Sequence, residues 1–410
     1  MSQVAPARAV AFQVVRRVFE DGAYADRALR AASTGLDDRD RALARRLAYG
    51  TVQRARTLDH AISELARRPV SRIDPPVRAA LRLGAYQLAF LDGVPRYAAV
   101  NESVELVRQA GAGRAVSFAN AVLRRLAEGI VPLLETLSEE TPTDAALRHS
   151  YPDWVAETWW RDLGPDGARA LMRAQNEPAE IAVRVVRGGV AGDPDPDLPG
   201  AVVVDEVDEE ALAQGRVWPQ SRGSQLVGHV VGSRHGEQVL DLCAAPGGKT
   251  TMLAGDVVAV EVNEARAEEL EANVRLLRAS HVRVVRADGR DLPPDLTGFD
   301  RALVDAPCSG LGVLASRPDL RWRAEPLPEL QLELLHAAID RVRPGGSVTY
   351  SVCTVNADES EAIVDATGLE PDPLGPEWPR FAHPRRPEFL QTLPHVHGTS
   401  GFFVARLRVP

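Results

Sequence analysis

The sequence predicts an all-α bundle at the N-terminus, a small α+β connecting module, and a C-terminal α/β domain built on a doubly wound parallel sheet. Apolar residues recur at three- and four-residue spacing through residues 1–130, whereas short β-branched runs alternate with helical stretches from about residue 216 onward. The chain of 410 residues also has the length of two or three domains. We therefore expect domains over residues 1–130, 131–215 and 216–410.

The N-terminal region is expected to be helical throughout. Arginines lie opposite the apolar positions, and glycine or proline steps at residues 22, 35, 68–69 and 93–95 separate the segments. The expected helices are residues 7–19, 38–54, 58–66, 75–91, 98–110 and 120–126. Short connections between such helices are typical of a bundle.

The connecting module has a weaker pattern. Residues 154–175 have helical periodicity, and residues 181–186 and 201–204 alternate like short strands. The Pro- and Asp-rich stretch 192–200 predicts a surface loop between those strands.

The C-terminal region alternates strand and helix. The expected strands are residues 239–242, 257–262, 281–285, 301–304 and 347–350, and the expected helices are residues 265–278 and 327–342. This spacing predicts a parallel sheet covered by helices on both faces. Residues 364–393 are Pro-rich and expected to be irregular, and residues 401–409 are expected to form a last strand.

Composition excludes several classes of protein. With 45% hydrophobic and 26% charged residues the chain is an ordinary globular protein, and no stretch approaches the ~18 consecutive apolar residues of a membrane helix. Cys243, Cys308 and Cys353 form no CxxC pair, so we expect no bound metal. The odd number of cysteines and the absence of a signal-peptide pattern favour a reducing, cytoplasmic compartment. Nothing in the sequence implies an oligomer.

Charge is unevenly distributed along the chain. The formal net charge is −9, but residues 1–130 hold 21 arginines against 13 acidic residues, so the remainder carries −17. A basic helical region is the electrostatic footprint expected of an RNA-binding domain. Lys249 is the only lysine in the chain.

Residues 239–250, VLDLCAAPGGKT, predict a buried strand, a glycine-rich turn and then a helix. Such a turn presents backbone N–H groups and a helix N-terminus to a polar or anionic ligand. The P-loop pattern of nucleotide hydrolases fails because it requires glycine at the position of Cys243, and the dinucleotide pattern G-x-G-x-x-G is absent. For Gly247 and Gly248 alone, a tight turn without a ligand remains the alternative.

Acidic residues stand at the ends of four expected strands: Asp241, Glu261, Asp288 and Asp305. Ligands of open α/β sheets bind outside the carboxyl ends of the strands. Any one of these acids is more often a helix cap, but four together favour a crevice for an adenosine-bearing cofactor.

Two cysteines follow the ends of expected strands, Cys308 in DAPCSG and Cys353 in YSVCT. A cysteine is usually a small buried hydrophobe, and we keep that interpretation for Cys243. Two further thiols above one crevice are less easily explained as packing alone. A thiol becomes a useful nucleophile when a positive neighbour or a helix N-terminus lowers its pKa. A disulfide between them is disfavoured by the expected compartment.

The segments DLCAAPGGKT, DAPCSGLG, RPDLRW (residues 317–322) and YSVCT, in this order, resemble the RsmB-like (Sun/Fmu) group of RNA cytosine-5 methyltransferases. Residues 1–130, with GAYQL at 84–88 and FANAVLR at 118–124, are similar to the NusB-like RNA-binding domain fused to that group. The resemblance implies a Rossmann-like class I methyltransferase domain, S-adenosylmethionine as cofactor, and a single-stranded or loop region of 16S rRNA as substrate. The same chemistry on tRNA, and a non-catalytic RNA-binding or ribosome assembly factor, remain alternatives.

The resemblance also implies roles for individual residues. Glu261 would bind the ribose, Asp288 would lie near the adenine, and Asp305 would lie by the methyl donor and the target base. Cys353 would be the nucleophile and Cys308 would assist product release. The residues implied to bind the cofactor are Cys243, Ala244, Ala245, Pro246, Gly247, Gly248, Lys249, Glu261, Asp288 and Asp305.

One further group of basic residues could contact RNA. Arg317, Arg321 and Arg323 surround Trp322, which would either stack on a base or pack in the core.

Overall fold

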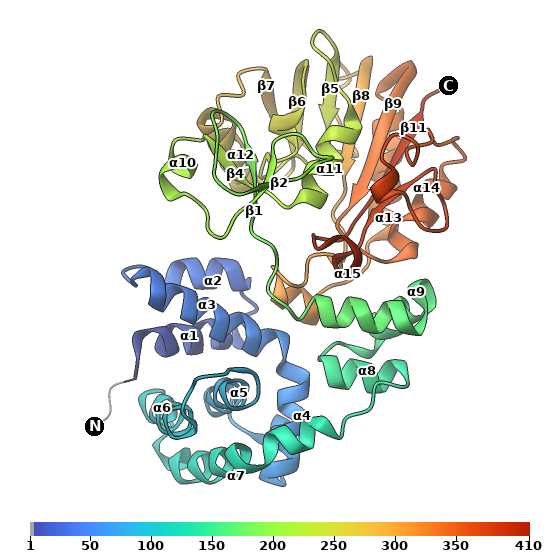
Figure 1. Ribbon diagram of the computed structural model, residues 1–410. Coiled ribbons are helices and arrows are strands. Elements are labelled where there is room, and N and C mark those ends of the chain that lie inside the picture. The colour runs from blue at the N-terminus through green and yellow to red at the C-terminus, as the bar shows by residue number, and fades with distance from the viewer. Residues whose placement is uncertain (1–3) are drawn as a thin grey trace. The chain divides into compact units, whose positions relative to one another are not determined.

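The computed structural model describes residues 4–410. The chain divides into two compact units (Figure 1). The first runs to Glu177 and also includes Leu314–Arg323, and the second comprises Pro178–Val313 and Ala324–Pro410.

The first unit is entirely helical, so the helical region extends beyond the expected residues 1–130 to the end of α9. Its α-helices are α1 (Pro6–Glu20), α2 (Ala25–Ala32), α3 (Asp38–Gln53), α4 (Ala55–Ala66), α5 (Pro75–Phe90), α6 (Arg96–Gln109), α7 (Val116–Glu135), α8 (Pro142–His149) and α9 (Asp153–Ala174), and its 3-10 helices include η1 (Val70–Arg72) and η2 (Gly113–Ala115). The apolar face of α7, with Val122, Leu123, Leu126 and Ile130, packs into one core shared by α1 to α7. The eight-residue helices α2 and α8 were not predicted individually, since so few residues give little periodicity.

The segment Leu314–Arg323 belongs to this helical unit and forms the 3-10 helix η4 (Pro318–Trp322). The side chain of Arg321 is fully buried, and its Nη1 donates to the carbonyl oxygens of Gln53 at 2.9 Å and Ser150 at 3.1 Å. Trp322 Nε1 donates to the Val52 carbonyl at 2.7 Å. Arg321 is therefore not available to RNA, and for Trp322 the core alternative is confirmed.

The second unit contains two sheets. The strands are β1 (Ala182–Val185), β2 (Asp193–Pro194), β3 (Ala201–Val203), β4 (Val217–Pro219), β5 (Gln238–Asp241), β6 (Asp256–Glu261), β7 (Val282–Arg286), β8 (Phe299–Asp305), β9 (Val342–Val352), β10 (Leu390–Thr392) and β11 (Phe402–Arg408). The helices are α10 (Glu209–Ala213), α11 (Arg222–Val231), α12 (Glu264–Leu276), α13 (Pro328–Ile339), α14 (Glu361–Ala366) and α15 (Pro394–His397), with 3-10 helices η3 (Thr250–Met252), η5 (Ala357–Glu359) and η6 (Pro379–Phe381).

The larger sheet has the order β10-β11-β9-β8-β5-β6-β7. Its strands from β11 to β7 are labelled in Figure 1. The five strands from β9 to β7 are parallel, and β11 and β10 continue the sheet antiparallel. Val239 packs into the core with α11, whereas the next residue, Leu240, packs into the core with α13. Both faces of the sheet are thus covered, and the expected doubly wound α/β fold is confirmed.

The smaller sheet, of order β2-β3-β1-β4, is antiparallel throughout. It buries a small core of its own that includes Val183, Val202 and Val217. Across residues 4–410, none of the helices combines the length and apolar character that a membrane crossing requires.

Candidate active site

The glycine-rich turn follows β5, as predicted, but the expected helix after it is wrong. Residues 242–249 form the turn, and only the 3-10 helix η3 separates it from β6, which begins at Asp256. Gly255 adopts φ +90°, and a Cβ there would lie 2.3 Å from the Glu237 carbonyl oxygen. The chain therefore turns directly into β6, which leaves room for only one short helical turn.

The backbone of the turn is held from two sides. Gly247 adopts φ +102°, and a Cβ there would lie 2.8 Å from Leu270 on α12, so this position favours glycine. Thr251 Oγ1 donates to the Gly247 carbonyl at 2.7 Å, and Arg184 Nη2 from the smaller sheet donates to Thr251 Oγ1 at 2.7 Å. The smaller sheet thus braces the turn.

The four predicted acids lie along one edge of the larger sheet. Asp305, Asp241 and Glu261 end the adjacent parallel strands β8, β5 and β6, and Asp288 lies just beyond the end of β7. Because the carboxyl ends of parallel strands meet at one edge, all four acids lie along the edge where the crevice is expected, although Asp241 itself is buried.

Glu261 and Asp288 are each held by local donors. Glu261 is buried, and its Oε1 accepts from the Asn263 N–H at 3.0 Å. Asp288 accepts from Arg290 Nε at 3.0 Å and Nη2 at 2.7 Å, and this guanidinium holds the pKa of the Asp288 carboxyl below its ordinary value. Arg266 Nε lies 3.6 Å from Glu261 Oε2 and its Nη2 donates to the Ala245 carbonyl at 2.8 Å, which ties Glu261 to the turn.

Asp305 is fixed by two donors at the centre of the edge. Its Oδ2 accepts from Lys249 Nζ at 2.7 Å, and its Oδ1 accepts from Ser351 Oγ at 2.7 Å. Lys249 Nζ also lies 4.8 Å from the ring centroid of Phe402. The single lysine of the chain therefore holds the carboxylate on which the methyl-transfer site was expected to centre.

The structure brings Cys308 and Cys353 together as free thiols. Their Sγ atoms are 3.4 Å apart, although 45 residues separate them in the sequence. The hydrogen bond with Cys308 and the positive charge of Lys249 lower the pKa of Cys353, while the pKa of Cys308 is raised by its contact with Cys353 and by burial. Cys353 is therefore the better nucleophile of the pair. Cys243 is a poor one, because burial raises the pKa of its thiol.

A buried carboxylate, Glu359, joins the two cysteine loops. Its Oε1 accepts from the backbone N–H of Ser309 at 2.9 Å and from Gln331 Nε2 at 2.9 Å, and its Oε2 accepts from the Ser309 hydroxyl. Gln331 Nε2 also lies within hydrogen-bonding distance, 2.9 Å, of the Pro307 carbonyl. The segment that carries Cys308 is thus fastened to the 3-10 helix that follows Cys353.

Several of these residues were not predicted from the sequence. Ser351 could have been, because residues two apart on a strand share a face and Ser351 stands two before Cys353. Arg290 follows Asp288 at a spacing that local turns commonly bridge. No pattern in the sequence marks Glu359, whose partners lie 28 and 50 residues away.

The crevice fits S-adenosylmethionine by the chemistry of its donors. A carboxylate at the end of the second strand, as Glu261 is here, suits the ribose hydroxyls of such a cofactor. Throughout the described residues, no group of three or more His, Cys, Asp or Glu side chains is placed to hold a metal ion.

Comparison with known proteins assigns both parts of the chain. Residues 229–408 match the 16S rRNA methyltransferase RsmB/F family, and residues 5–128 match the NusB family. The ribosomal RNA small subunit methyltransferase B of Thermus thermophilus is 35% identical, over 98% of this chain and 97% of the relative. The enzyme of the same name from Salmonella arizonae is 31% identical over 98% of both chains. A Mycobacterium tuberculosis protein named only as a methyltransferase is 36% identical, over 98% of this chain and 96% of the relative.

Solved structures agree on the fold. The crystal structure of PH0851 superposes with a TM-score of 0.82 over 99% of both chains at 22% identity. The structure of NSun6 from Pyrococcus horikoshii superposes with a TM-score of 0.52, over 64% of this chain and 99% of that chain, also at 22% identity. Together with the full-length relatives, the matched segments show that the chain belongs to the RsmB/F family of S-adenosylmethionine-dependent RNA cytosine-5 methyltransferases and carries an N-terminal NusB domain.

Proposed function

We propose that this protein methylates carbon 5 of a cytosine in a single-stranded or loop region of 16S rRNA, in the cytoplasm, through a covalent adduct with Cys353. The observation that carries the proposal is the pair of free thiols 3.4 Å apart, beside the Lys249–Asp305 contact. The family and the names of the full-length relatives support the 16S target. Free thiols also suit the reducing conditions of the cytoplasm.

Cys353 begins the reaction. Its thiolate adds to C6 of the cytosine, forming an Sγ–C6 bond and moving the electrons of the C5–C6 double bond onto C5. Cytosine carbon 5 is a weak nucleophile in the aromatic ring, so this addition makes it reactive. Bound S-adenosylmethionine supplies the methyl group that C5 then takes from its sulfonium.

Asp305 orients and stabilises the activated base. Lys249 and Ser351 hold its two oxygens, and the remaining lone pairs accept from the cytosine N4 amino group and from N3–H when that nitrogen is protonated. The base must leave its stack to reach these groups, so we expect the target cytosine to lie in unpaired RNA.

Cys308 completes the turnover. The C5 proton passes to a base, the C5–C6 double bond re-forms, and Cys353 departs as a thiolate. Cys308, whose sulfur lies beside that of Cys353, is positioned to assist this elimination. The residues that hold the cofactor meanwhile are the turn Cys243–Lys249, Glu261 on the ribose and Asp288 near the adenine.

Bisulfite mapping tests the proposal directly. Ribosomal RNA and tRNA from cells with the gene deleted are compared with RNA from cells complemented by the wild-type gene or by Cys353→Ala. We expect one 16S 5-methylcytosine to disappear on deletion, to return with the wild type and to stay absent with Cys353→Ala. Loss of a tRNA site instead would reassign the substrate, and no lost 5-methylcytosine in any RNA would refute the enzymatic proposal.

A further inference from the structure

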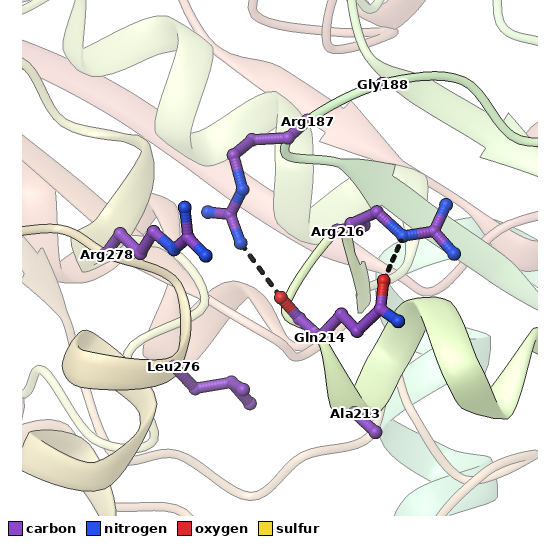
Figure 2. A pocket seen from close by; sticks show the side chains of 7 residues that line it. All are labelled: Arg187, Gly188, Ala213, Gln214, Arg216, Leu276 and Arg278. Atoms are coloured by element: carbon purple, nitrogen blue, oxygen red, sulfur yellow. Dashed lines mark hydrogen bonds between the residues drawn. The ribbon is translucent and has the colours of Figure 1, made fainter.

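A cleft of about 560 Å³ lies on the second unit, outside the crevice described above. Its lining comes from the end of β1, the turn between α10 and β4, and the C-terminal end of α12. Three arginines, Arg187, Arg216 and Arg278, line it together with Gln214 and Leu276 (Figure 2). We call it the arginine cleft.

The charged residues that line the arginine cleft are all positive, and the carboxylate of Glu210, which accepts from Gln214 Nε2 at 2.9 Å, does not itself line it. None of its lining residues is acidic, and within residues 4–410 none of its three arginines forms an ion pair. The guanidinium groups of Arg187 and Arg278 are turned toward each other (Figure 2). Like charges that converge in this way repel, and a bound anion would relieve the repulsion.

Part of this arrangement is structural. Arg187 Nη1 donates to the Leu277 carbonyl at 3.1 Å and its Nη2 donates to the Gln214 carbonyl at 2.9 Å, so Arg187 closes the C-terminal end of α12. Arg216 is held by Gln214 Oε1, which accepts from its Nε at 2.8 Å. These contacts fix the positions of two guanidinium groups but leave their charges in place.

Within the described part of the chain, the Arg278 side chain makes no comparable structural contact, and the backbone conformation at this position disfavours any residue with a Cβ. It follows the end of α12 at φ +57°, the left-handed conformation in which helices commonly place glycine. A side chain other than glycine is strained there. An arginine at this position therefore costs stability, which suggests that its side chain serves another purpose.

We propose that the arginine cleft binds the phosphodiester backbone of the substrate RNA away from the target nucleotide, an inference that rests on the proposed RNA methyltransferase function. Outside residues 1–130 the chain carries a net −17, so its general field repels RNA and a local positive site is needed. Arginine is suited to phosphate oxygens because its guanidinium presents several donors in a fixed plane. A phosphodiester chain runs along an open surface cleft and contacts its arginines without being enclosed.

The test compares a double variant, Arg216→Gln with Arg278→Gly, with a matched control, Arg275→Gln with Arg283→Gln. The control removes the same charge from two exposed arginines of α12 and β7 that do not line the cleft. Arg187 is left unchanged because it also supports α12. The dissociation constant of in vitro transcribed 16S rRNA is measured for each protein between 50 and 200 mM KCl, a range over which phosphate contacts weaken strongly.

We expect the cleft variant to bind the transcript about tenfold more weakly than wild type. The slope of its affinity against salt concentration, on logarithmic scales, should fall by the equivalent of one to two phosphate contacts. The affinity of the control should stay within about twofold of wild type. The KM of the cleft variant for RNA should rise, while its kcat at saturating RNA and its affinity for S-adenosylmethionine stay unchanged. Its melting temperature should be equal to or above that of wild type, because Arg278→Gly relieves the strained backbone.

The cleft proposal is overturned if the cleft variant matches the control in affinity and salt dependence while wild type binds the transcript. It is also overturned if inorganic phosphate at low millimolar concentration binds wild type but not the cleft variant while RNA affinity is equal in both, which would make this a small-anion site. If wild type binds RNA but forms no 5-methylcytosine, the methyltransferase function fails instead, and the affinity comparison still decides the cleft.

Discussion

Lys249 Nζ lies 2.7 Å from Asp305 Oδ2, and Asp305 Oδ1 accepts from Ser351 at 2.7 Å. The one lysine of the chain thus acts on both a carboxylate that would hold the base and the thiol that would attack it, since its charge also lowers the pKa of Cys353. A compact ammonium fits beside the Phe402 ring, whereas a planar guanidinium is wider. Two substitutions separate the effects of charge and shape.

Lys249→Met should raise the pKa of Cys353, because the thiolate loses a positive neighbour. Lys249→Arg should leave that pKa close to the wild-type value but lower kcat about tenfold, because the larger group displaces Asp305. The pKa is read from the pH dependence of iodoacetamide alkylation at Cys353, followed by mass spectrometry of the Cys353 peptide. Alkylation rises with pH as the thiolate forms. An unshifted midpoint in Lys249→Met would show that the ammonium does not activate the thiol.

Alanine substitution of the two cysteines should block different steps of the reaction. Cys353→Ala should abolish methylation and form no covalent complex, because the attacking sulfur is gone. Cys308→Ala should accumulate a denaturation-resistant protein–RNA complex, since addition and methyl transfer proceed but elimination slows. Gel electrophoresis of both variants with 16S rRNA transcript and S-adenosylmethionine measures this. Accumulation with Cys353→Ala rather than Cys308→Ala would reverse the assigned roles.

Glu359 should act on the chemistry through the position of the Cys308 segment. Glu359→Gln places an amide where the carboxylate accepts from Ser309 and Gln331, and lost or mispaired buried hydrogen bonds cost about 1–3 kcal/mol each. We expect lower stability and also slower resolution of the covalent RNA complex. The control is Glu361→Gln, whose carboxylate pairs with His383 at 3.0 Å. It should lower stability without slowing resolution, and equal resolution rates in the two variants would make Glu359 merely structural.

The sequence could predict what depends on local periodicity and on strand ends. The parallel sheet places Asp241, Glu261 and Asp305 at one edge, because each closes a β-branched run and neighbouring parallel strands end together. The prediction of a helix after the glycine-rich turn is wrong. The close approach of Gly255 to the Glu237 carbonyl is a tertiary contact, which no local sequence pattern encodes.

Residues that depend on distant packing could not be predicted. Arg321 and Arg323 stand two apart in one arginine-rich segment, yet Arg321 is fully buried whereas Arg323 is exposed. The 3-10 helix η4 turns their side chains in different directions, and only the presence of the α3 and α8 carbonyls decides which one is buried. The same limit explains Glu359, whose contacts with Ser309 and Gln331 arise only through packing.

Arg321 should be essential to the stability of the helical unit. Its guanidinium donates to Gln53 O and Asn176 Oδ1, each at 2.9 Å, and lies 3.8 Å from the Tyr151 ring centroid. Arg321→Met leaves these buried acceptors without a donor and should destabilise the unit by about 3–5 kcal/mol. Calorimetry should show a lower melting temperature for one transition. Arg124→Gln, at an exposed position of α7, should change stability by no more than about 0.5 kcal/mol. A similar loss in both variants would refute the assignment.

Asp241 should make stability fall as pH rises. Burial raises its pKa to about 7 in the folded protein, against about 3.9 in an unfolded chain. Between these two pKa values the folded state holds a proton that the unfolded state has lost. The free energy of unfolding therefore falls with each unit of rising pH. Above pH 7 this loss levels off, at as much as about 4 kcal/mol. Asp241→Asn keeps an acceptor for the Thr250 hydroxyl, which donates to Asp241 Oδ2 at 2.7 Å, and removes the titration. Urea unfolding from pH 5 to pH 8 should therefore show a variant that gains on wild type as pH rises and is the more stable protein at pH 8. The control is Asp256→Asn, which changes an exposed carboxylate of the neighbouring strand. Its stability should change with pH in parallel with that of wild type. If the stability of Asp241→Asn also ran parallel to that of wild type, this buried carboxyl would not titrate between pH 5 and pH 8.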